Sequence, residues 1–543
     1  MTPSQSSRRQ PARQPKSQQG PSDSLSVRST TEPPSRTGLA FPAAFALTIG
    51  SFAFLTKNVT LQRTFVSVAV ALLIWCIALW TAAARGNRPL RLEFVPRRQH
   101  WVQALTQFSL IFYWALHTPL VFAFFPFIFV QLVFAFAVDS LLTWSRRDVY
   151  VLGFGPFPII FSINLFLLFK PEWFYWQFVL IALGFLAKEF IRWNREGRLA
   201  HIFNPSSFPL AVFSLVLLLT GTTEVTFGNF IANTIFDTPH IFLAIFLLSL
   251  PVQVLFGVAR VTIGAAVTMY VIGLLYLAAT GTYLFYDAYI PPAVFIGMTL
   301  LVTDPSTSPR TDAGRFTFGA LYAIGTILLF ILLERVHAPT FYDKLLPIPI
   351  LNLMVRRIDS IARSRWLSRF APERLAPSLT PIRRNLAITS LWAATFIGLF
   401  ATRAVGDNHP GQYLPFWHTA CGGGSARACS YVATLTVVFC NKGSGWACNE
   451  TGILERRLGQ PADASFRRAC DLGFNAGCAN LTRSTGDVSS LSSDHPSLRD
   501  LPIVLSGTKP PLRERDPAKL YALACDQGWP GACNGGWAET SRQ

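Results

Sequence analysis

Eight of the nine cysteines are candidates for covalent or metal chemistry, because they follow residue 420 in pairs of identical spacing. The pairs are each eight positions apart: Cys421/Cys429, Cys440/Cys448, Cys470/Cys478 and Cys525/Cys533. Structural zinc sites usually pair ligands about two to four residues apart, whereas the wider gap across a helical turn suits a covalent bond between neighbouring helices. We therefore predict four disulfides rather than zinc, and disulfides require an oxidising compartment.

Two further segments place proline and polar residues directly before an apolar stretch: HIFNPSSFPLAVF (201–213) and MTLLVTDPSTSPRTDAGRFTFGALYAIG (298–325). Proline lacks an amide donor and clashes with the preceding turn, so each motif ends one backbone segment and opens another. The exposed helix N-termini offer amide donors and a positive dipole end to an anion or polar ring. The alternative is a pair of capped cytoplasmic loops. We predict two facing broken helices that bind a polar ligand through Asn204, Pro205, Ser206, Thr303, Asp304, Pro305, Thr307 and Ser308.

The elements that must position these residues are membrane helices. The chain is 51% hydrophobic and 14% charged, whereas soluble proteins carry about 25% charged residues. Apolar stretches such as 65–84, 261–284 and 316–333 are long enough to cross a hydrocarbon core of about 30 Å. Cys76 lies in the first of these and is expected to act as a small hydrophobic residue. We predict an all-α polytopic membrane protein with about thirteen spans between residues 39 and 403.

The distribution of charge predicts the orientation. The net charge is +18, but the basic residues lie in short loops between spans, which indicates cytoplasmic loops rather than nucleic-acid binding. These loops are 85–99, 145–148, 188–201, 303–315 and 356–385, whereas 220–239 and 286–291 contain no Lys or Arg. Residues 1–38 have almost no apolar content and are expected to form a disordered cytoplasmic tail. A membrane domain at 39–360, a basic linker at 361–385 and a last span at 386–403 then leave the cysteine-rich region outside the cytoplasm.

The cysteine-rich segments share a frame, seen in FRRACDLGFNAGCANL and YALACDQGWPGACNGG. We expect a helix that ends at the first cysteine, a polar turn with glycine, and Ala-Cys at the start of the next helix. This frame resembles the Sel1-like repeat, in particular its cysteine-rich bacterial variety, over residues 418–540. The resemblance implies that helix B of one repeat is bonded to helix A of the next.

The repeat array is uneven. The steps between pairs are 19, 30 and 55 residues, so the first unit is short and the last carries an insertion at 484–515. Helical repeats form concave protein-binding surfaces, so a scaffold for an extracytoplasmic protein partner is expected.

The membrane motifs also carry a resemblance. The runs TDPSTSPRTDAGRFTFGAL (303–321), LNLMVRRID (351–359) and FNPSSF (203–208) are similar to motifs of the RnfD/NqrB family, and the UnbU family shares the same signature. The resemblance covers about residues 100–360. It implies an electron-carrying subunit of an ion-translocating oxidoreductase in the bacterial inner membrane, beside other membrane subunits.

The same resemblance implies a flavin, either FMN or riboflavin, held near the membrane. The family attaches FMN to the threonine of an S-G-A-T motif after the F-N-P span. Here that loop reads LTGTTEVTFGNF (219–230) and lacks the motif. Only Thr222 or Thr223 could substitute, so a non-covalently bound flavin is expected.

Polar residues inside apolar stretches are further candidates, because a charge in lipid is costly and usually functional. Lys188 and Glu189 lie near a span end and are expected to reach the interface or to pair with each other. Asp139 is placed more deeply, as a helix-packing or proton-linked group. The remaining two are Asn164 and His117.

Three functions therefore stand at this point. The first is electron transport with a flavin, the second is a small-solute transporter or channel, and the third is a membrane anchor for the repeat scaffold. No Ser/His/Asp set, P-loop, haem motif or zinc signature occurs in the sequence, so hydrolase, ATPase and cytochrome activities lack support.

Overall fold

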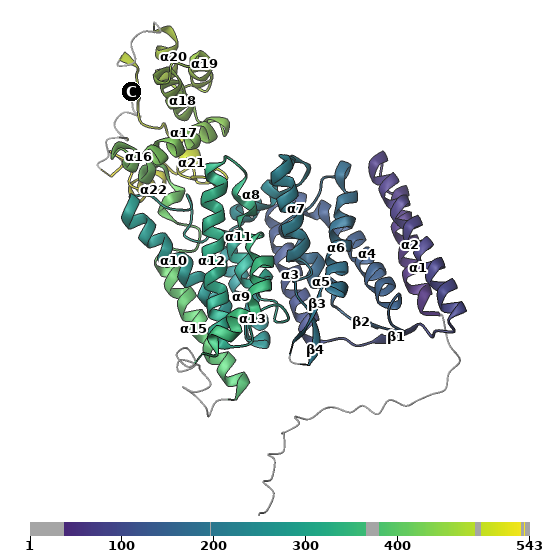
Figure 1. Ribbon diagram of the computed structural model, residues 1–543. Helices are drawn as coiled ribbons and strands as arrows, with labels where there is room; N and C mark the ends of the chain where they lie inside the picture. The colour runs from purple at the N-terminus through teal and green to yellow at the C-terminus, as the bar shows by residue number, and fades with distance from the viewer. Residues whose placement is uncertain (1–36, 196, 365–379, 484–489, 534–536, 538–543) are drawn as a thin grey trace, which may run out of the picture.

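Helices form nearly all of the regular structure in the computed structural model, which describes residues 37–195, 197–364, 380–483, 490–533 and 537 (Figure 1). Within these residues, strands are limited to two short pairs. The all-α expectation is confirmed. The predicted tail at 1–38 lies almost entirely outside the described residues, as do most of the basic linker at 361–385 and the end of the repeat region.

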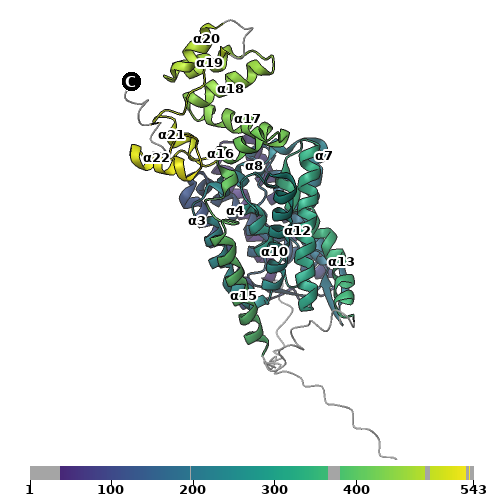
Figure 2. The same ribbon diagram turned by 90° about the vertical axis from the view of Figure 1, so that its left-hand side faces the viewer.

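The helices between residues 40 and 401 run roughly in the same direction and form one slab that is more than one helix wide in both views (Figures 1 and 2). We call this slab the layer. They are α1 (Ala40–Ser51), α2 (Val59–Arg85), α3 (Arg98–His117), α4 (Phe125–Trp144), α5 (Pro156–Asn164), α6 (Tyr175–Phe190), α7 (Ser207–Thr220), α8 (Gly228–Asp237), α9 (Ile241–Phe256), α10 (Ala259–Thr280), α11 (Pro292–Ile296), α12 (Asp312–Arg335), α13 (Pro347–Ala362) and α15 (Pro381–Ala401).

Within the described residues, five helices are long and apolar enough to cross a membrane, and a sixth span results if the bent pair α8 and α9, which meet at 97°, counts as one. The five are α2, the stretch Pro119–Trp144 that contains α4, α10, α12 and α15. The expectation of about thirteen spans is therefore wrong. Several predicted spans are interrupted instead: α5 has 9 residues and α11 only 5 before a π-helical turn, η6 (Gly297–Leu301). At about 1.5 Å per residue such pieces are shorter than a bilayer core.

Two glycines bring α10 and α12 into direct backbone contact. A Cβ atom at Gly264 would lie 2.2 Å from the carbonyl oxygen of Phe316, and one at Gly319 would lie 1.9 Å from that of Val261. Small residues at such crossings are typical of helix packing in membranes. The contact fixes the start of α12, and with it the preceding T-D-P loop, against α10.

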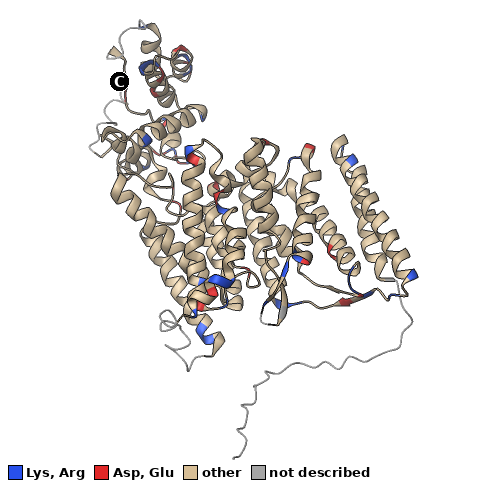
Figure 3. Cartoon of the chain, viewed as in Figure 1, with Lys and Arg blue, Asp and Glu red and all other residues tan. Residues whose placement is uncertain are grey.

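One end of the layer, which we call the basic face, carries both strand pairs. β1 (Arg91–Phe94) pairs in parallel with β2 (Val149–Leu152), and β3 (Arg192–Arg195) forms a hairpin with β4 (Arg198–His201). Lys and Arg residues also gather there, at the end of α13 and the start of α15 (Figure 3). Basic residues are not confined to this face. The loops before α2 and α6 lie at the opposite end, where Asn58 bonds to Glu172, and they contain Lys57 and Lys170.

The repeat domain covers the opposite end of α10 and α12, which we call the repeat-domain face (Figure 2). It contains α16 (Leu414–Gly422), α17 (Ala426–Asn441), α18 (Gly445–Arg457), α19 (Asp463–Asp471), α20 (Asn475–Thr482), α21 (Leu501–Val504) and α22 (Pro517–Asp526). All four predicted cysteine pairs form disulfides, and Cys76 is a buried free thiol.

Two of the paired cysteines need a separate description. Cys533 lies in a turn after the end of α22, and Gly531 in this turn has a φ of 80°. Residues 534–536 lie outside the described part of the chain, so the expectation that Ala-Cys opens a helix there stays a prediction. Cys478 does lie in the first turn of α20, but it follows a glycine instead of an alanine.

The glycine before Cys478 has a packing reason. A Cβ atom at Gly477 would lie 2.5 Å from the Cβ atom of Ala469 on α19. Only glycine permits this close crossing of α19 and α20, so the Ala-Cys frame is not kept in this repeat.

The described part of the insertion packs onto the repeats. The carboxylate of Asp500 accepts hydrogen bonds from Ser444 Oγ (2.8 Å) and from the backbone amide of Trp446 (3.2 Å), so it caps the start of α18. The insertion is therefore held in place by the repeat that precedes it.

Candidate functional site

The F-N-P motif forms a turn that Asn204 organises. The side-chain oxygen of Asn204 accepts hydrogen bonds from Ser206 N (2.9 Å), Ser206 Oγ (2.7 Å) and Ser207 N (3.2 Å). Asparagine commonly satisfies free amides at a helix start in this way, and Pro205 prevents a continuous helix. The amides that open α7 are thus partly engaged by the motif itself.

The T-D-P motif closes on itself in a similar way. Asp304 accepts hydrogen bonds at its carboxylate from Ser306 N (3.1 Å) and Thr307 Oγ1 (2.9 Å), and its backbone carbonyl accepts from Ser308 N (3.0 Å). Thr303 donates its hydroxyl to a carbonyl one turn earlier (2.8 Å). The preceding turn is the π-helical η6, a feature that frequently occurs at functional sites.

Two asparagines join these motifs, which lie about a hundred residues apart in the chain. Asn204 Nδ2 donates to the carbonyl of Leu301 at 3.0 Å. Asn352 on α13 accepts from Asn204 N (3.2 Å) and donates to the carbonyl of Thr307 (3.2 Å). The two motifs therefore form one buried polar centre, which we call the motif centre.

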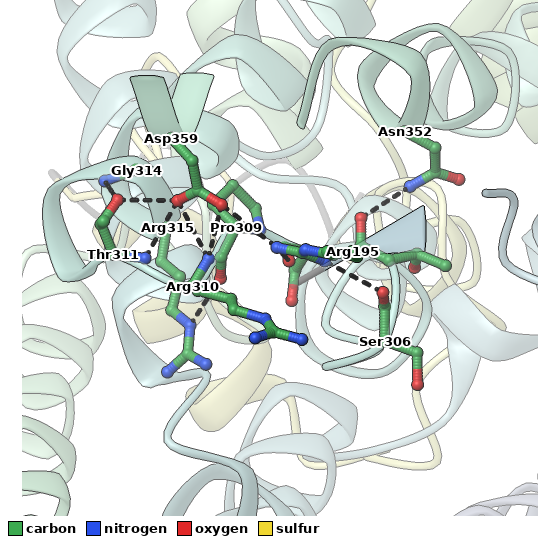
Figure 4. Close-up of polar contacts among 11 residues, drawn as sticks. Arg195, Ser306, Pro309, Arg310, Thr311, Gly314, Arg315, Asn352 and Asp359 are labelled. Atoms are coloured by element: carbon green, nitrogen blue, oxygen red, sulfur yellow. Dashed lines mark hydrogen bonds and ion pairs between the residues drawn. The ribbon is translucent and has the colours of Figure 1, made fainter. Parts of the chain in front are cut away.

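A buried carboxylate on α13 holds the loop after the T-D-P motif (Figure 4). Asp359 accepts hydrogen bonds from the amides of Arg310 and Thr311 (both 3.0 Å) and from Thr311 Oγ1 (2.9 Å). Arg195 lies 3.1 Å from Asp359 and also donates to the carbonyls of Ser306 and Ser308 (3.2 and 3.0 Å). Since a buried ion pair costs desolvation unless its hydrogen bonds are complete, this full set of partners makes the loop rigid.

A cavity of about 120 Å³, which we call the motif cavity, lies between the motifs. His201 and Asp304 lie side by side on its wall, with Nε2 of the histidine 3.6 Å from Oδ2 of the aspartate, and His100 and Lys188 line it as well. Burial by itself raises the pKa of Asp304, but His201 and the hydrogen bonds from Ser306 and Thr307 outweigh it, so the pKa lies below its ordinary value. The cavity thus presents a carboxylate beside three nitrogen groups, a set suited to water, a proton or a small ion.

The volume of this cavity does not fit a flavin ring. Pockets for drug-sized ligands usually measure about 300–1,000 Å³, whereas about 120 Å³ holds a few water molecules. The amides and hydroxyls of both motifs also largely have partners within the protein. The structure therefore gives no place for an isoalloxazine between Asn204 and Asp304.

The eight predicted ligand-binding residues of the two motifs divide into those that line the motif cavity and those that lie next to it. Asn204, Pro205, Ser206 and Asp304 line the motif cavity. Thr303, Thr307 and Ser308 are buried behind it, and Pro305 is half-buried in the same loop.

Thr222 and Thr223 lie apart from the others, beyond the far end of α7. A helix of 14 residues separates them from Asn204, a distance of about 20 Å. Neither residue lines the motif cavity.

The disulfide cysteines differ in their relation to a groove of about 380 Å³ on the repeat domain, which we call the repeat groove. Cys421 and Cys429 line this groove. Cys478, which is half-buried, and Cys533, which is exposed, line neither the repeat groove nor the motif cavity. These two predicted site residues therefore serve as covalent links, with S–S distances of 1.99 and 2.02 Å to their partners, and belong to no ligand site described for the chain.

The polar residues predicted inside the membrane have specific partners. Lys188 pairs with Asp139 at 3.1 Å, and Glu189 pairs with Arg147 and Arg192. The expected pairing of Lys188 with Glu189 is therefore wrong, because adjacent helical residues point in different directions.

The two remaining candidates differ in their surroundings. Asn164 belongs to a buried amide cluster, in which it bonds to Gln131 (2.8 Å) and Gln131 bonds to Gln177 (3.0 Å). His117 is exposed and bonds to the carbonyl of Tyr113 (3.0 Å).

Three residues of the site were not predicted from the sequence: Arg195, Asn352 and Asp359. A signal for two of them existed, because Asn352 and Asp359 are seven residues apart on an otherwise apolar face of α13, and residues at that spacing share a face. Within the described residues, no group of three or more His, Cys, Asp or Glu side chains could hold a metal ion.

No family model matches the chain, and a search of curated proteins finds no significant relative.

Proposed function

We propose that the protein is a multi-pass protein of the bacterial inner membrane, with a cytoplasmic N-terminus and the repeat domain outside the cytoplasm. The proposal rests on the long apolar helices, on the basic face at one end and on four disulfides at the other. Disulfides persist in oxidising compartments, and basic loops remain cytoplasmic. Cysteine labelling in intact cells, with single cysteines placed at the exposed positions Arg97 and Glu224, tests this orientation.

Within that membrane, we propose that the chain is a divergent RnfD/NqrB-like subunit of an electron-transport assembly that moves ions. The observation that carries the proposal is the meeting of the F-N-P and T-D-P motifs through Asn204 and Asn352. It supports a built polar site where the resemblance places function.

The chemistry assigned to the motif centre is ion or proton handling by Asp304, His201, His100 and Lys188. A flavin bound without covalent linkage has to be held outside this cavity, by this chain or by another subunit.

The test uses the full-length protein purified in mild detergent. Flavin absorption that is released by denaturation, together with co-purified membrane subunits, supports the proposal. In proteoliposomes with those subunits, Asp304→Asn should abolish ion movement while Asp148→Asn, at an exposed ion pair with Arg88, should not. A colourless protein without partners would contradict it.

A small-solute transporter is the second candidate, favoured by polar cavities at both ends of α12. The motif cavity lies before its first turn, and a larger cavity includes Phe330 near its last. Solute uptake into liposomes by the purified chain alone, without an electron donor, would select this function.

We further propose that the repeat domain binds an extracytoplasmic protein. The repeat groove is lined by Trp446, Trp529 and Trp537 with Glu450 and Arg457, and aromatic and arginine side chains are typical of interaction hot spots. If deletion of 405–543 removes all function while Asp304→Asn has no effect, the chain is an anchor for this domain.

A further inference from the structure

A further cavity, of about 880 Å³, lies where the repeat domain meets the membrane layer. We call it the junction cavity. Its walls come from α8, from the segments 285–294 and 337–344, and from Tyr431 and Val438 of α17. This volume falls within the range of about 300–1,000 Å³ that ligand pockets occupy. Both parts of the protein therefore contribute to one space of ligand size.

The repeat domain is firmly attached at this place. Arg427 of α17 donates to the carbonyl of Leu284 (2.7 Å) and pairs with Glu334 of α12 (3.2 Å). The rings of Tyr286 and Tyr431 stack at 4.2 Å, one from each side of the junction. The wall formed by α17 is thus a fixed part of the cavity.

The junction cavity is rich in acidic groups. Three carboxylates line it, those of Asp237, Asp287 and Asp343, and Lys344 also belongs to the lining. Lys344 lies 3.3 Å from Asp343. One carboxylate–ammonium pair therefore leaves two further carboxylates on the walls.

Asp343 already has a cationic partner inside the protein. Its side chain is about 4% exposed, and its Oδ1 atom lies 3.3 Å from the Lys344 ammonium. A buried carboxylate is costly unless it is paired, and here the pair is formed. The carboxylates left to meet a ligand are therefore those of Asp237 and Asp287.

Two lysines close to the cavity are already engaged elsewhere. Lys442 donates to the carbonyls of Gly507 and Thr508 (3.3 and 3.2 Å), and Lys509 pairs with Asp407 (3.2 Å). The carbonyl acceptors leave the charge of Lys442 in place, whereas Asp407 balances the charge of Lys509. Against Lys442, the two carboxylates of Asp237 and Asp287 leave one negative charge in excess. The cavity therefore favours a positive ligand.

Aromatic rings complete the lining, and they point to the class of cation. The rings belong to Phe236, Phe285, Tyr286, Phe330, Phe341 and Tyr431. Three of these rings already hold a cation of the chain: Lys509 lies over Phe236, Arg427 over Tyr286 and Lys344 over Phe341. Aromatic faces of this kind attract organic ammonium groups by cation–π interaction, whereas metal ions prefer clustered oxygen, nitrogen or sulfur ligands. Carboxylates beside aromatic faces match an ammonium group on an organic body.

We propose that the junction cavity binds a small organic ammonium ion, held by Asp237 and Asp287 and by the aromatic walls, with the repeat domain forming one side of the site. This site is separate from the motif centre and does not depend on the electron-transport proposal.

The experiment measures binding to the full-length protein in detergent by isothermal titration calorimetry. Choline is the probe, and dimethylbutanol, which replaces the charged nitrogen by carbon in the same shape, is the neutral comparison. We expect choline to bind at least about tenfold more tightly than dimethylbutanol, as for a charge-assisted contact.

Variants locate the site. Asp287→Asn and Asp237→Asn should each weaken choline binding about tenfold or more, and Tyr431→Leu should weaken it from the repeat-domain side. Asp471→Asn, an exposed change on α19, is the matched control and should leave binding unchanged. Thermal unfolding of each variant shows that it is folded.

The proposal is overturned if choline and dimethylbutanol bind equally or not at all, or if the control variant loses as much affinity as Asp287→Asn. Choline binding that survives both cavity variants in folded protein would also overturn it.

Discussion

The motif centre and the junction cavity lie at opposite ends of the same helix, α12, yet they are built in opposite ways. In the motif centre, Asn204, Asp304, Asn352 and Asp359 bond to neighbouring backbone and hydroxyl groups and leave only about 120 Å³. At the junction, about 880 Å³ remains open beside the carboxylates of Asp237 and Asp287. The motifs of Pro, Asn, Asp and Ser therefore mark backbone whose hydrogen-bonding groups find partners within the protein. Space for a ligand is found where the membrane helices meet the repeat domain.

The largest expected effect comes from breaking the motif centre at Asp359. Asp359→Ala removes the acceptor of two amides and a hydroxyl and leaves Arg195, whose side chain is 7% exposed, without its carboxylate. Loss of one partner of a buried pair costs about 3–5 kcal/mol. The thermal unfolding midpoint in detergent should fall strongly, while choline binding at low temperature stays unchanged.

The matched control is Asp148→Ala, which breaks a pair with Arg88 at an aspartate that is 49% exposed. Exposed pairs contribute about 0–1 kcal/mol. If the two variants unfold at the same temperature, the motif centre is not a rigid unit.

A smaller effect is expected on the junction side from the disulfide that ends α17. Replacing Cys440 and Cys448 by serine opens a loop whose ends are 8 positions apart, which costs about 2.5 kcal/mol in the chain-entropy account. Because Val438 and Tyr431 on the same helix line the junction cavity, choline affinity should fall together with the stability of the repeat domain.

The pair Cys470/Cys478 closes a loop of the same length on α19 and α20, outside the cavity lining. Its replacement should lower the stability of the domain by a similar amount and leave choline affinity intact. Equal losses of affinity in both double variants would mean that the whole domain, rather than α17, shapes the site.

The sequence predicts some features of the repeat domain and of the motif centre, and does not predict others. The spacing of Cys421 and Cys429, repeated three times, predicted covalent links, because such regularity has few other causes. It did not predict the close crossing of α19 and α20 at Gly477, which depends on local packing. The two proline motifs predicted broken helices, since proline acts locally.

The partners of these motifs were not predictable in the same way. Arg195 and Asp359 are 164 positions apart, and no local pattern encodes their pairing. The junction cavity was not predictable for the same reason, because its walls come from segments that are far apart in the chain.

The smallest and most specific effect is the pH dependence of the junction cavity. Burial raises the pKa of Asp287 from 3.8 to about 6, with Asp237 adding to the rise and Lys509 opposing it. Below about pH 6 the carboxyl is neutral, so choline affinity should fall about tenfold per pH unit there and level off above it. Titration calorimetry from pH 8 to about pH 5 measures this step.

The effect on stability has the opposite sign in the free protein. Since the pKa of Asp287 is higher in the folded than in the unfolded state, its contribution to stability is fully present below 3.8 and is lost as the pH rises through about 6. Choline should therefore raise the unfolding temperature only above that pH. Asp287→Asn should remove the step in affinity, while His337→Gln, which changes the histidine on the same wall, should keep it. A step that persists in Asp287→Asn, or one that disappears in His337→Gln, would leave Asp287 without a role in ligand recognition.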